Sequence, residues 1–137
     1  MDNVLFDTNV ILDLALKRAP HFDHAVSLFA LIDENKISAY VTASTITDIY
    51  FISKRQKGHE IALEFISNLV DVVNIIGVDK EIISRALASK LKDFEDAVQV
   101  SAAEYNGIDC IITRNESDFL NATLKIFNPR QFLDQQK

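Results

Sequence analysis

Short runs of apolar residues alternate along the chain with segments in which apolar residues recur every three or four positions. The short runs suit strands, and the longer spacing places apolar side chains on one face of a helix. Residues 4–6, 37–41, 72–78, 110–113 and 124–127 are predicted to form strands. Helices are predicted from about residue 10 until Pro20 ends the first one, over residues 22–32, 44–53, 61–69, 80–91 and 94–105, and in a small helix from Pro129. Ser44 or Thr45, Asp79 and Asp93 are the candidate N-caps.

The order of these elements predicts the fold class. Strands alternate with helices from one end to the other, which is typical of a parallel sheet covered by helices. Residues 4–6 are apolar throughout, as expected for a strand with both faces covered. No repeat, linker or low-complexity segment interrupts the 137 residues. We expect one domain over residues 1–137 with an α/β fold, a three-layer α/β/α sandwich around a mainly parallel central sheet of four or five strands.

The amino-acid composition limits the classes of protein to which the chain can belong. The content of 48% hydrophobic and 25% charged residues is ordinary for a soluble globular protein. No apolar run is long enough to span a bilayer and no signal-peptide pattern begins the chain, so a cytoplasmic location is expected. Cys110 is the single cysteine, which excludes an internal disulfide.

The charge balance argues against binding nucleic acid by bulk attraction. The formal charge is −6, which disfavours general attraction to phosphate groups. Basic residues nevertheless cluster at 17–18, 54–57 and 90–92, where solvated helix ends are an equally good explanation.

Acidic side chains follow the predicted strands or begin the predicted helices. The candidates are Asp7 after the first strand, Asp48 in the helix after the second strand, Asp93, Glu95 and Asp96 at a later helix start, and the segment from Thr113 through Arg114 and Asn115 to Asp118. In parallel sheets, ligands bind beyond the carboxyl ends of the strands. Two carboxylates about 4 Å apart repel by ~4 kcal/mol at an effective dielectric of 20, so converging acids need protons or a cation. Hard divalent cations such as Mg²⁺ suit oxygen ligands.

Local roles compete with metal binding at several of these positions. Asp93 is better explained as the N-cap of the helix that follows, and Asp96 can be a first-turn acid of the same helix. Asp118 can cap a short helix, and Asp48 can be a solvated helix residue. Asp7 has few solvated alternatives because its neighbours are apolar. Zinc is not indicated, since Cys110 is alone and the histidines form no ligand pattern.

Together these residues resemble the PIN-domain family of metal-dependent ribonucleases, which includes the toxins of VapC-type toxin–antitoxin pairs. The matching segments are FDTNVILDL at 6–14, TASTITDIYFISKR at 42–55, DFEDAVQVSAAEYNGIDCIITRNESDF at 93–119 and FNPRQFL at 127–133. The likeness follows essentially the whole chain in order. The first motif alone is weakly specific, whereas the long third segment is much more so.

The resemblance implies a role for each matching position. Asp7 and Asp96 match the principal metal carboxylates. Asp48 matches a position that is often glutamate, so its shorter side chain favours contact through water. Asn115 matches a position that is often aspartate; it can ligate or orient a water, and Asp118 can supply the missing charge. Thr8, Asn9, Ser44 and Thr113 are suited to orienting carboxylates or phosphate oxygens, and Arg114 to holding a phosphate, with a buried ion pair as its alternative role.

The implied function is hydrolysis of RNA phosphodiester bonds by a water that one or two Mg²⁺ or Mn²⁺ ions activate, as the toxin of a toxin–antitoxin pair. The implied partners are the RNA substrate, a cognate antitoxin and a second copy of the chain in a homodimer, with no membrane contact. The alternative is a weakened PIN-fold scaffold or binding module, which Asn115 and the short Asp48 keep open. An aspartyl-phosphate phosphatase is disfavoured because Asn9 stands where a second acid is needed, and a response-regulator receiver because no early acidic pair is present.

Overall fold

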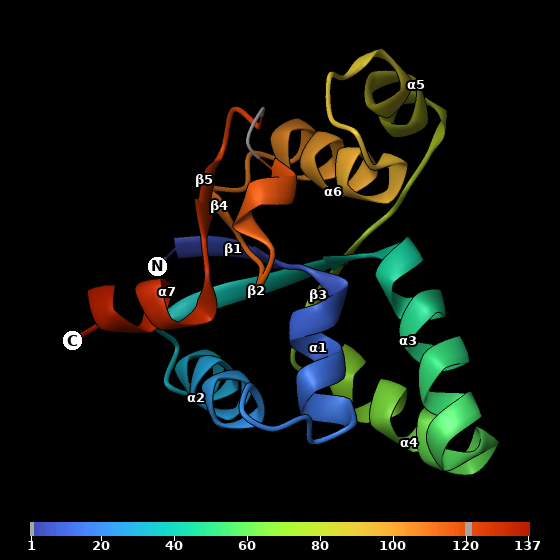
Figure 1. Ribbon diagram of the computed structural model, residues 1–137, viewed down its shortest axis with the longest axis vertical. Coiled ribbons are helices and arrows are strands. Elements are labelled where there is room, and N and C mark those ends of the chain that lie inside the picture. Colours follow the sequence, from blue (N-terminus) through green and yellow to red (C-terminus); the bar gives the residue numbers. More distant parts are fainter. Residues whose placement is uncertain (1, 120–121) are drawn as a thin grey trace.

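The computed structural model describes residues 2–119 and 122–137, and a five-stranded parallel sheet forms its centre (Figure 1). The strands lie in the order β3-β2-β1-β4-β5, and every neighbouring pair is parallel. Their bounds are β1 Asp2–Phe6, β2 Ile37–Thr42, β3 Asn74–Ile76, β4 Cys110–Ile112 and β5 Lys125–Phe127. The expected parallel sheet of four or five strands is confirmed.

Helices cover both faces of this sheet, as Figure 1 shows. Their bounds are α1 Thr8–Ala15, α2 Phe22–Asp33, α3 Ala43–Lys57, α4 His59–Val70, α5 Lys80–Ala88, α6 Phe94–Tyr105 and α7 Pro129–Gln135, with the 3-10 helix η1 at Glu116–Phe119. Helices α5 and α6 pack together on one face, and α1, α2, α3, α4 and α7 lie on the other. The α/β/α sandwich is therefore confirmed.

The strand β1 shows why a fully apolar run forms the centre of the sheet. Its successive side chains point to opposite faces, so Phe6 packs in the core beneath α1 and α2 while Leu5 packs beneath α6. Both side chains are fully buried. Burial of a side chain of this size stabilises the fold by about 1.5–3 kcal/mol, so a strand with apolar residues on both faces is favoured only between two helical layers.

Several element boundaries differ from those expected. Helix α3 begins at Ala43 because Thr42, and not Ser44 or Thr45, is its N-cap: the Thr42 side chain accepts a hydrogen bond of 3.2 Å from the backbone N–H of Thr45. Helix α3 continues to Lys57, where Gly58, with φ 92°, ends it. Strand β3 is shorter than expected because the N–H groups of Val72 and Val73 bond back to the carbonyl of Leu69.

Two expected N-caps and one expected helix are confirmed, whereas two helices end earlier in the chain than expected. Asp79 and Asp93 cap α5 and α6, each accepting a 3.0 Å hydrogen bond from the N–H three residues later. Helix α6 has the bounds that the apolar spacing predicts. The first helix ends at Ala15, before Pro20, and α5 ends at Ala88, short of the expected residue 91.

The strand order reverses direction between β1 and β4, which is where parallel sheets bind ligands. From β1 the chain proceeds outward to β2 and β3, then returns to place β4 on the other side of β1. The backbone N–H of Asp7 donates a 3.0 Å hydrogen bond to the carbonyl of Ile112, so the carboxyl ends of β1 and β4 lie side by side. Over residues 2–119 and 122–137, no helix is both long and apolar enough to cross a membrane.

Candidate active site

The Asp7 carboxylate ends β1 and is held by two hydrogen bonds from distant parts of the chain. Asp7 occupies the N-cap position of α1, but its side chain makes no capping hydrogen bond. Instead Thr113 Oγ1 donates to Asp7 Oδ2 at 2.7 Å, and Gln99 Nε2 donates to Asp7 Oδ1 at 2.9 Å. Asp7 is only 5% exposed. Its orientation is therefore set by β4 and α6 and not by its own helix.

Acidic side chains from other elements face the same cavity as Asp7. The cavity has a volume of about 380 Å³ at the carboxyl ends of the strands. Its lining comprises Asp7, Thr8, Asn9, Leu12, Asp48, Ile52, Asp93, Glu95, Asp96, Asn115 and Asp118. These residues come from α1, α3, the start of α6 and the segment after β4. Acids separated widely in the sequence are thus brought to one place.

The acids in this cavity raise one another's pKa values. Partial burial, and then the charges of Asp7, Asp93 and Asp118, raise the pKa of Asp96 to about 7. Partial burial, and then a hydrogen bond with Asp48 and its charge, raise the pKa of Glu95 to about 7. None of the described residues lining the cavity is basic. No basic side chain among these lining residues is therefore available to neutralise the negative charge.

The donor set of this cavity suits a hard divalent cation. Every candidate ligand is a carboxylate, amide or hydroxyl oxygen, the type that Mg²⁺ and Mn²⁺ prefer. Within residues 2–119 and 122–137, no three His, Cys, Asp or Glu side chains already surround a common point. Mg²⁺ usually takes one or two protein carboxylates and keeps several waters, so it does not require such a cage. The residues present fit this kind of ion.

Hydroxyl groups connect the start of α3 to the acidic cavity. Thr42 Oγ1 donates to Thr45 Oγ1 at 3.2 Å, and the Thr45 and Thr8 hydroxyls lie 2.8 Å apart. Thr8 Oγ1 in turn donates to Glu95 Oε1 at 3.4 Å. Ser44 joins this chain through Thr42, at 2.9 Å, and does not line the cavity. These contacts tie α3, α1 and α6 together behind the acids.

The structure brings most of the sequence-predicted site residues together. Asp7, Asp48, Asp96, Asn115 and Asp118, together with Thr8 and Asn9, line the cavity. Thr113 lies behind Asp7 and orients it. Arg114 does not line the cavity; its Nε lies 2.7 Å from Asp13 Oδ2, so it forms the ion pair considered as the alternative to phosphate binding.

Sequence reasoning missed Gln99 altogether, and it named Asp93 and Glu95 as candidate acids without giving them a metal-binding role. Gln99 is almost fully buried and holds Asp7, whereas Glu95 and Asp93 line the cavity. Asp93 has both functions, because it also caps α6. Gln99 follows Asp96 by three residues, a spacing that places both on one helix face and that could have indicated it.

A larger cavity of about 580 Å³ lies elsewhere, between α2 and α7. Its lining mixes His24, Glu34, Arg130 and Lys137 with apolar residues. Its two carboxylates, Glu34 and Asp134, share the lining with the basic residues Arg130 and Lys137, so no excess of acids gathers there. Size alone therefore does not identify the site.

Comparisons with known proteins agree with this arrangement. The family model described as PIN domain matches residues 3–117. No curated protein matches the sequence. Solved structures with the same fold include VapBC2 from Rickettsia felis bound to a DNA fragment from its promoter, with 13% identity, a TM-score of 0.72 and coverage of 92% of this chain and 98% of that chain.

Two further structures share the fold at similarly low identity. One is a toxin–antitoxin complex from Klebsiella pneumoniae, with 22% identity, a TM-score of 0.70 and coverage of 92% of this chain and 97% of that chain. The other is VapC20 from Mycobacterium tuberculosis, described as a sarcin-ricin loop cleaving toxin, with 16% identity, a TM-score of 0.65 and coverage of 79% and 86%.

Proposed function

The chain belongs to the PIN-domain family, and on this premise we propose that it is a Mg²⁺- or Mn²⁺-dependent ribonuclease that hydrolyses RNA phosphodiester bonds. The observation that most supports the proposal is the cavity beside Asp7, where acids from four chain segments converge without a basic lining residue. One structure with the same fold, VapC20, is described as cleaving the sarcin-ricin loop, an RNA target.

In the proposed reaction, different residues of the chain hold the ion, orient a water and keep the Asp7 carboxylate in place. Asp7 and Asp96 would hold one ion, with Asp48 and Asp118 positioned to contact it through water or to hold a second ion. When bound, the ion lowers the pKa of a bound water and stabilises the charge that develops on the phosphate. Asn115 can orient a water through its amide oxygen. Thr113 and Gln99 keep the Asp7 carboxylate in place, so it need not reorient during the reaction.

Helix α3 offers a path for the RNA backbone beside the acids. Asp48 and Ile52 of α3 line the cavity, and Lys54 and Arg55 are exposed on the next turn of the same helix. Phe51 is also exposed, at 61%, and can stack on a base. We propose that these cations attract phosphates locally, although the chain carries a formal charge of −6.

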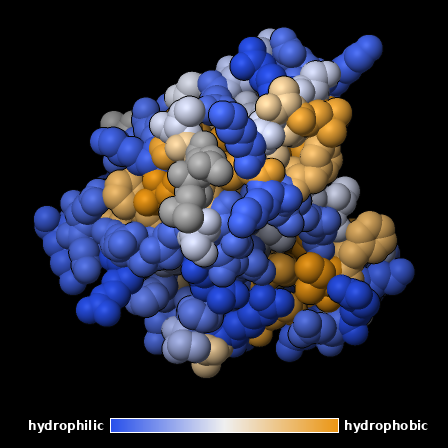
Figure 2. All heavy atoms as spheres, turned by 45° about the horizontal axis from the view of Figure 1, so that its top comes forward, coloured by the Kyte–Doolittle hydropathy of each residue, from blue (hydrophilic) through white to orange (hydrophobic). Residues whose placement is uncertain are grey.

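We propose that the protein acts as one domain in the cytoplasm, as the toxin of a toxin–antitoxin pair, and that it forms a homodimer. Two of the structures with the same fold, from Rickettsia felis and Klebsiella pneumoniae, are toxin–antitoxin complexes. Figure 2 shows a largely hydrophilic face on which hydrophobic residues gather in separate patches. Val26 in α2 is among the exposed large apolar residues available to partners. Light scattering of the purified chain, alone and with an antitoxin encoded beside it, tests both partners.

Cleavage of defined RNAs by the purified protein tests the central proposal. Cleavage is expected with Mg²⁺ or Mn²⁺ and lost with EDTA, and Asp7→Asn or Asp96→Asn should each abolish it while the protein remains folded. Asp33→Asn, on the exposed end of α2, is the matched control and should cleave normally. If the wild type neither cleaves RNA nor gains stability from either metal, the scaffold alternative is correct.

A further inference from the structure

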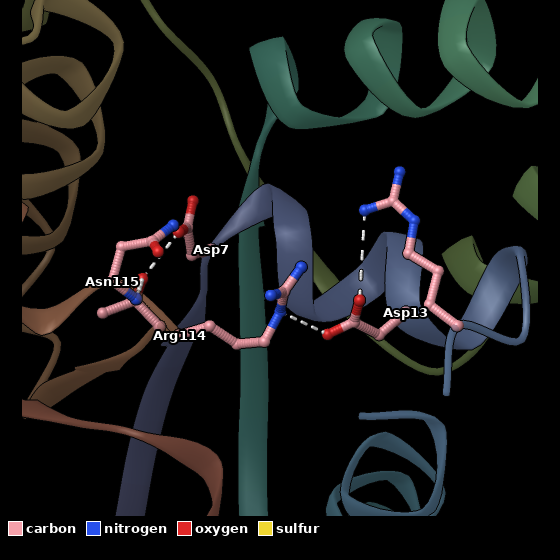
Figure 3. A network of polar contacts seen from close by, with 6 residues as sticks. Asp7, Asp13, Arg114 and Asn115 are labelled. Atoms are coloured by element: carbon pink, nitrogen blue, oxygen red, sulfur yellow. Dashed lines mark hydrogen bonds and ion pairs between the residues drawn. The ribbon is translucent and has the colours of Figure 1, made fainter. Parts of the chain in front are cut away.

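Asp13 in α1 is a buried carboxylate outside the acidic cavity. It is only 2% exposed, and two arginines approach it: Arg114 Nε lies 2.7 Å from Oδ2, and Arg18 Nη1 lies 4.0 Å from Oδ1. Figure 3 shows the Arg114 side chain extending away from Asp7, along α1 to Asp13. Arg114 therefore directs its charge to a buried partner and not into the cavity that contains the other acids.

Stability alone does not account for this ion pair. Breaking a buried ion pair is costly, but replacing both partners by apolar residues of similar size is often neutral or stabilising. Here the Arg114 Nε–H is not aligned for a hydrogen bond despite the short distance. Asp13 Oδ1 also accepts no hydrogen bond from any residue within 2–119 and 122–137. The pair is thus imperfectly satisfied, and a role in fixing one conformation is the better explanation.

The position of Arg114 in the chain indicates which conformation is fixed. Its two neighbours are the residues that connect β4 to the acidic site: Thr113 Oγ1 donates to Asp7 and accepts a 3.0 Å hydrogen bond from the N–H of Asn115. Asp118 N–H then bonds to the Asn115 carbonyl at 3.0 Å. Residues 113–118 therefore contact α1 and its N-cap residue at two points, through Thr113 to Asp7 and through Arg114 to Asp13.

We infer that Asp13 and Arg114 are a pair of positioning residues that hold segment 113–118, and with it Asn115 and Asp118, in place against Asp7. Neither residue touches the substrate in this proposal. The effect of the pair on catalysis rests on the proposed ribonuclease function. The positioning of segment 113–118 does not depend on that function. The competing role for Arg114 is direct contact with a substrate phosphate, which its planar donor group also suits. The two roles predict different variant behaviour.

Amide hydrogen exchange of the 137-residue chain tests whether the pair holds segment 113–118, and it requires no catalysis. Asp13→Asn and Arg114→Met should each accelerate exchange at Asn115 and Asp118 at least tenfold while leaving β1 and α6 protected. Arg18→Met is the matched control, because it removes the other arginine near Asp13 and leaves segment 113–118 tied to α1. Unchanged exchange at 113–118 in Asp13→Asn and Arg114→Met overturns the inference, whether or not the wild type cleaves RNA.

The double variant Asp13→Leu/Arg114→Met separates positioning from a merely structural role and also covers the case in which a single variant does not fold. Two apolar partners are expected to restore the melting temperature. If the pair positions the segment, exchange at Asn115 and Asp118 stays fast in this folded variant. If exchange returns to the wild-type rate together with stability, the pair is only structural and the inference is wrong.

Steady-state kinetics then separate positioning from phosphate contact. A small displacement of catalytic groups lowers the rate steeply, so Asp13→Asn and Arg114→Met should both lower kcat about 10- to 100-fold with KM nearly unchanged. A phosphate contact predicts the opposite pattern: Arg114→Met raises KM, while Asp13→Asn, which frees Arg114, does not. That pattern overturns the inference. A wild type that cleaves no RNA would refute the proposed function instead, and the exchange data would still decide the role of the pair.

Discussion

Thr113 Oγ1 donates a 2.7 Å hydrogen bond to Asp7 Oδ2, joining two residues that are 106 positions apart in the sequence. The contact exists because β1 and β4 are adjacent parallel strands whose last residues, Phe6 and Ile112, are paired. Both partners are buried. The most buried acid of the cavity is thus oriented by a residue of the neighbouring strand.

Removing the Thr113 hydroxyl should reduce both stability and activity. Thr113→Val keeps the shape but leaves Asp7 Oδ2 and the Asn115 N–H without their partner, which costs about 1–3 kcal/mol for a buried polar group. Urea unfolding measures this loss. Thr113→Ser retains the hydroxyl and should lose much less. Equal stability of the valine and serine variants would show that the hydrogen bond is unimportant.

Gln99 should influence metal affinity although it does not line the cavity. It donates to Asp7 Oδ1, and residues that orient metal ligands typically affect affinity 10- to 100-fold. Gln99→Met should therefore weaken Mn²⁺ binding by about that factor, measured by isothermal titration calorimetry. Gln56→Met, on the exposed face of α3, is the control and should bind Mn²⁺ as the wild type does.

Without metal, the protein should lose stability as the pH rises from about 4 to about 7. The pKa values of Asp96 and Glu95 are raised from 3.8 and 4.5 to about 7, so the folded state holds these protons more tightly than the unfolded chain does. Their contribution is fully present below the unfolded-state pKa values and is lost as the pH passes the folded ones.

Urea midpoints measured in EDTA between pH 5 and pH 8 test this pH dependence. Asp96→Asn removes one of the two groups, so the difference in stability between this variant and the wild type should grow in the variant's favour over that range. Asp33→Asn should show a constant difference. A constant difference for Asp96→Asn as well would mean that neither burial nor the neighbouring acids raise the pKa of Asp96 in the folded protein.

Divalent metal should reverse the destabilisation at high pH. A ligand that binds only the folded state at 100 times its Kd stabilises by about 2.7 kcal/mol, which raises the melting temperature measurably. Mg²⁺ or Mn²⁺ should have this effect at pH 8 on the wild type and little effect on Asp7→Asn. The same rise in Asp7→Asn would place the metal elsewhere.

The salt dependence of RNA binding tests the proposed path along α3. Each cation that neutralises a phosphate of single-stranded RNA contributes a slope of about −0.7 to the logarithm of affinity against the logarithm of salt concentration. Lys54→Gln/Arg55→Gln should therefore flatten the slope by about 1.4 in fluorescence anisotropy titrations with EDTA present. Lys90→Gln/Lys92→Gln, at the other basic cluster, should leave the slope unchanged.

The start of helix α3 shows why local sequence patterns did not predict every helix boundary. Residues 42–45 include three adjacent or nearly adjacent hydroxyl side chains, each of which can cap a helix. Thr42 is the cap because β2 continues through Thr42, which pairs with Ile76 of β3, and the helix starts directly afterwards. Strand pairing decides between caps that are chemically equivalent in the sequence.

Local sequence patterns were enough to predict the order of the elements and the parallel sheet, because apolar runs and helical spacings are local properties that persist in the fold. The apolar neighbours of Asp7 favoured a role for it in the site, whereas Asp96 was favoured only by the resemblance to PIN domains; both residues line the cavity. The three-dimensional structure was needed to find Gln99, to show that Thr113 bonds to Asp7 in particular, and to choose the ion pair with Asp13 over phosphate binding for Arg114. Those contacts depend on which strands are neighbours and on where each helix crosses the sheet, and packing across the whole chain sets both.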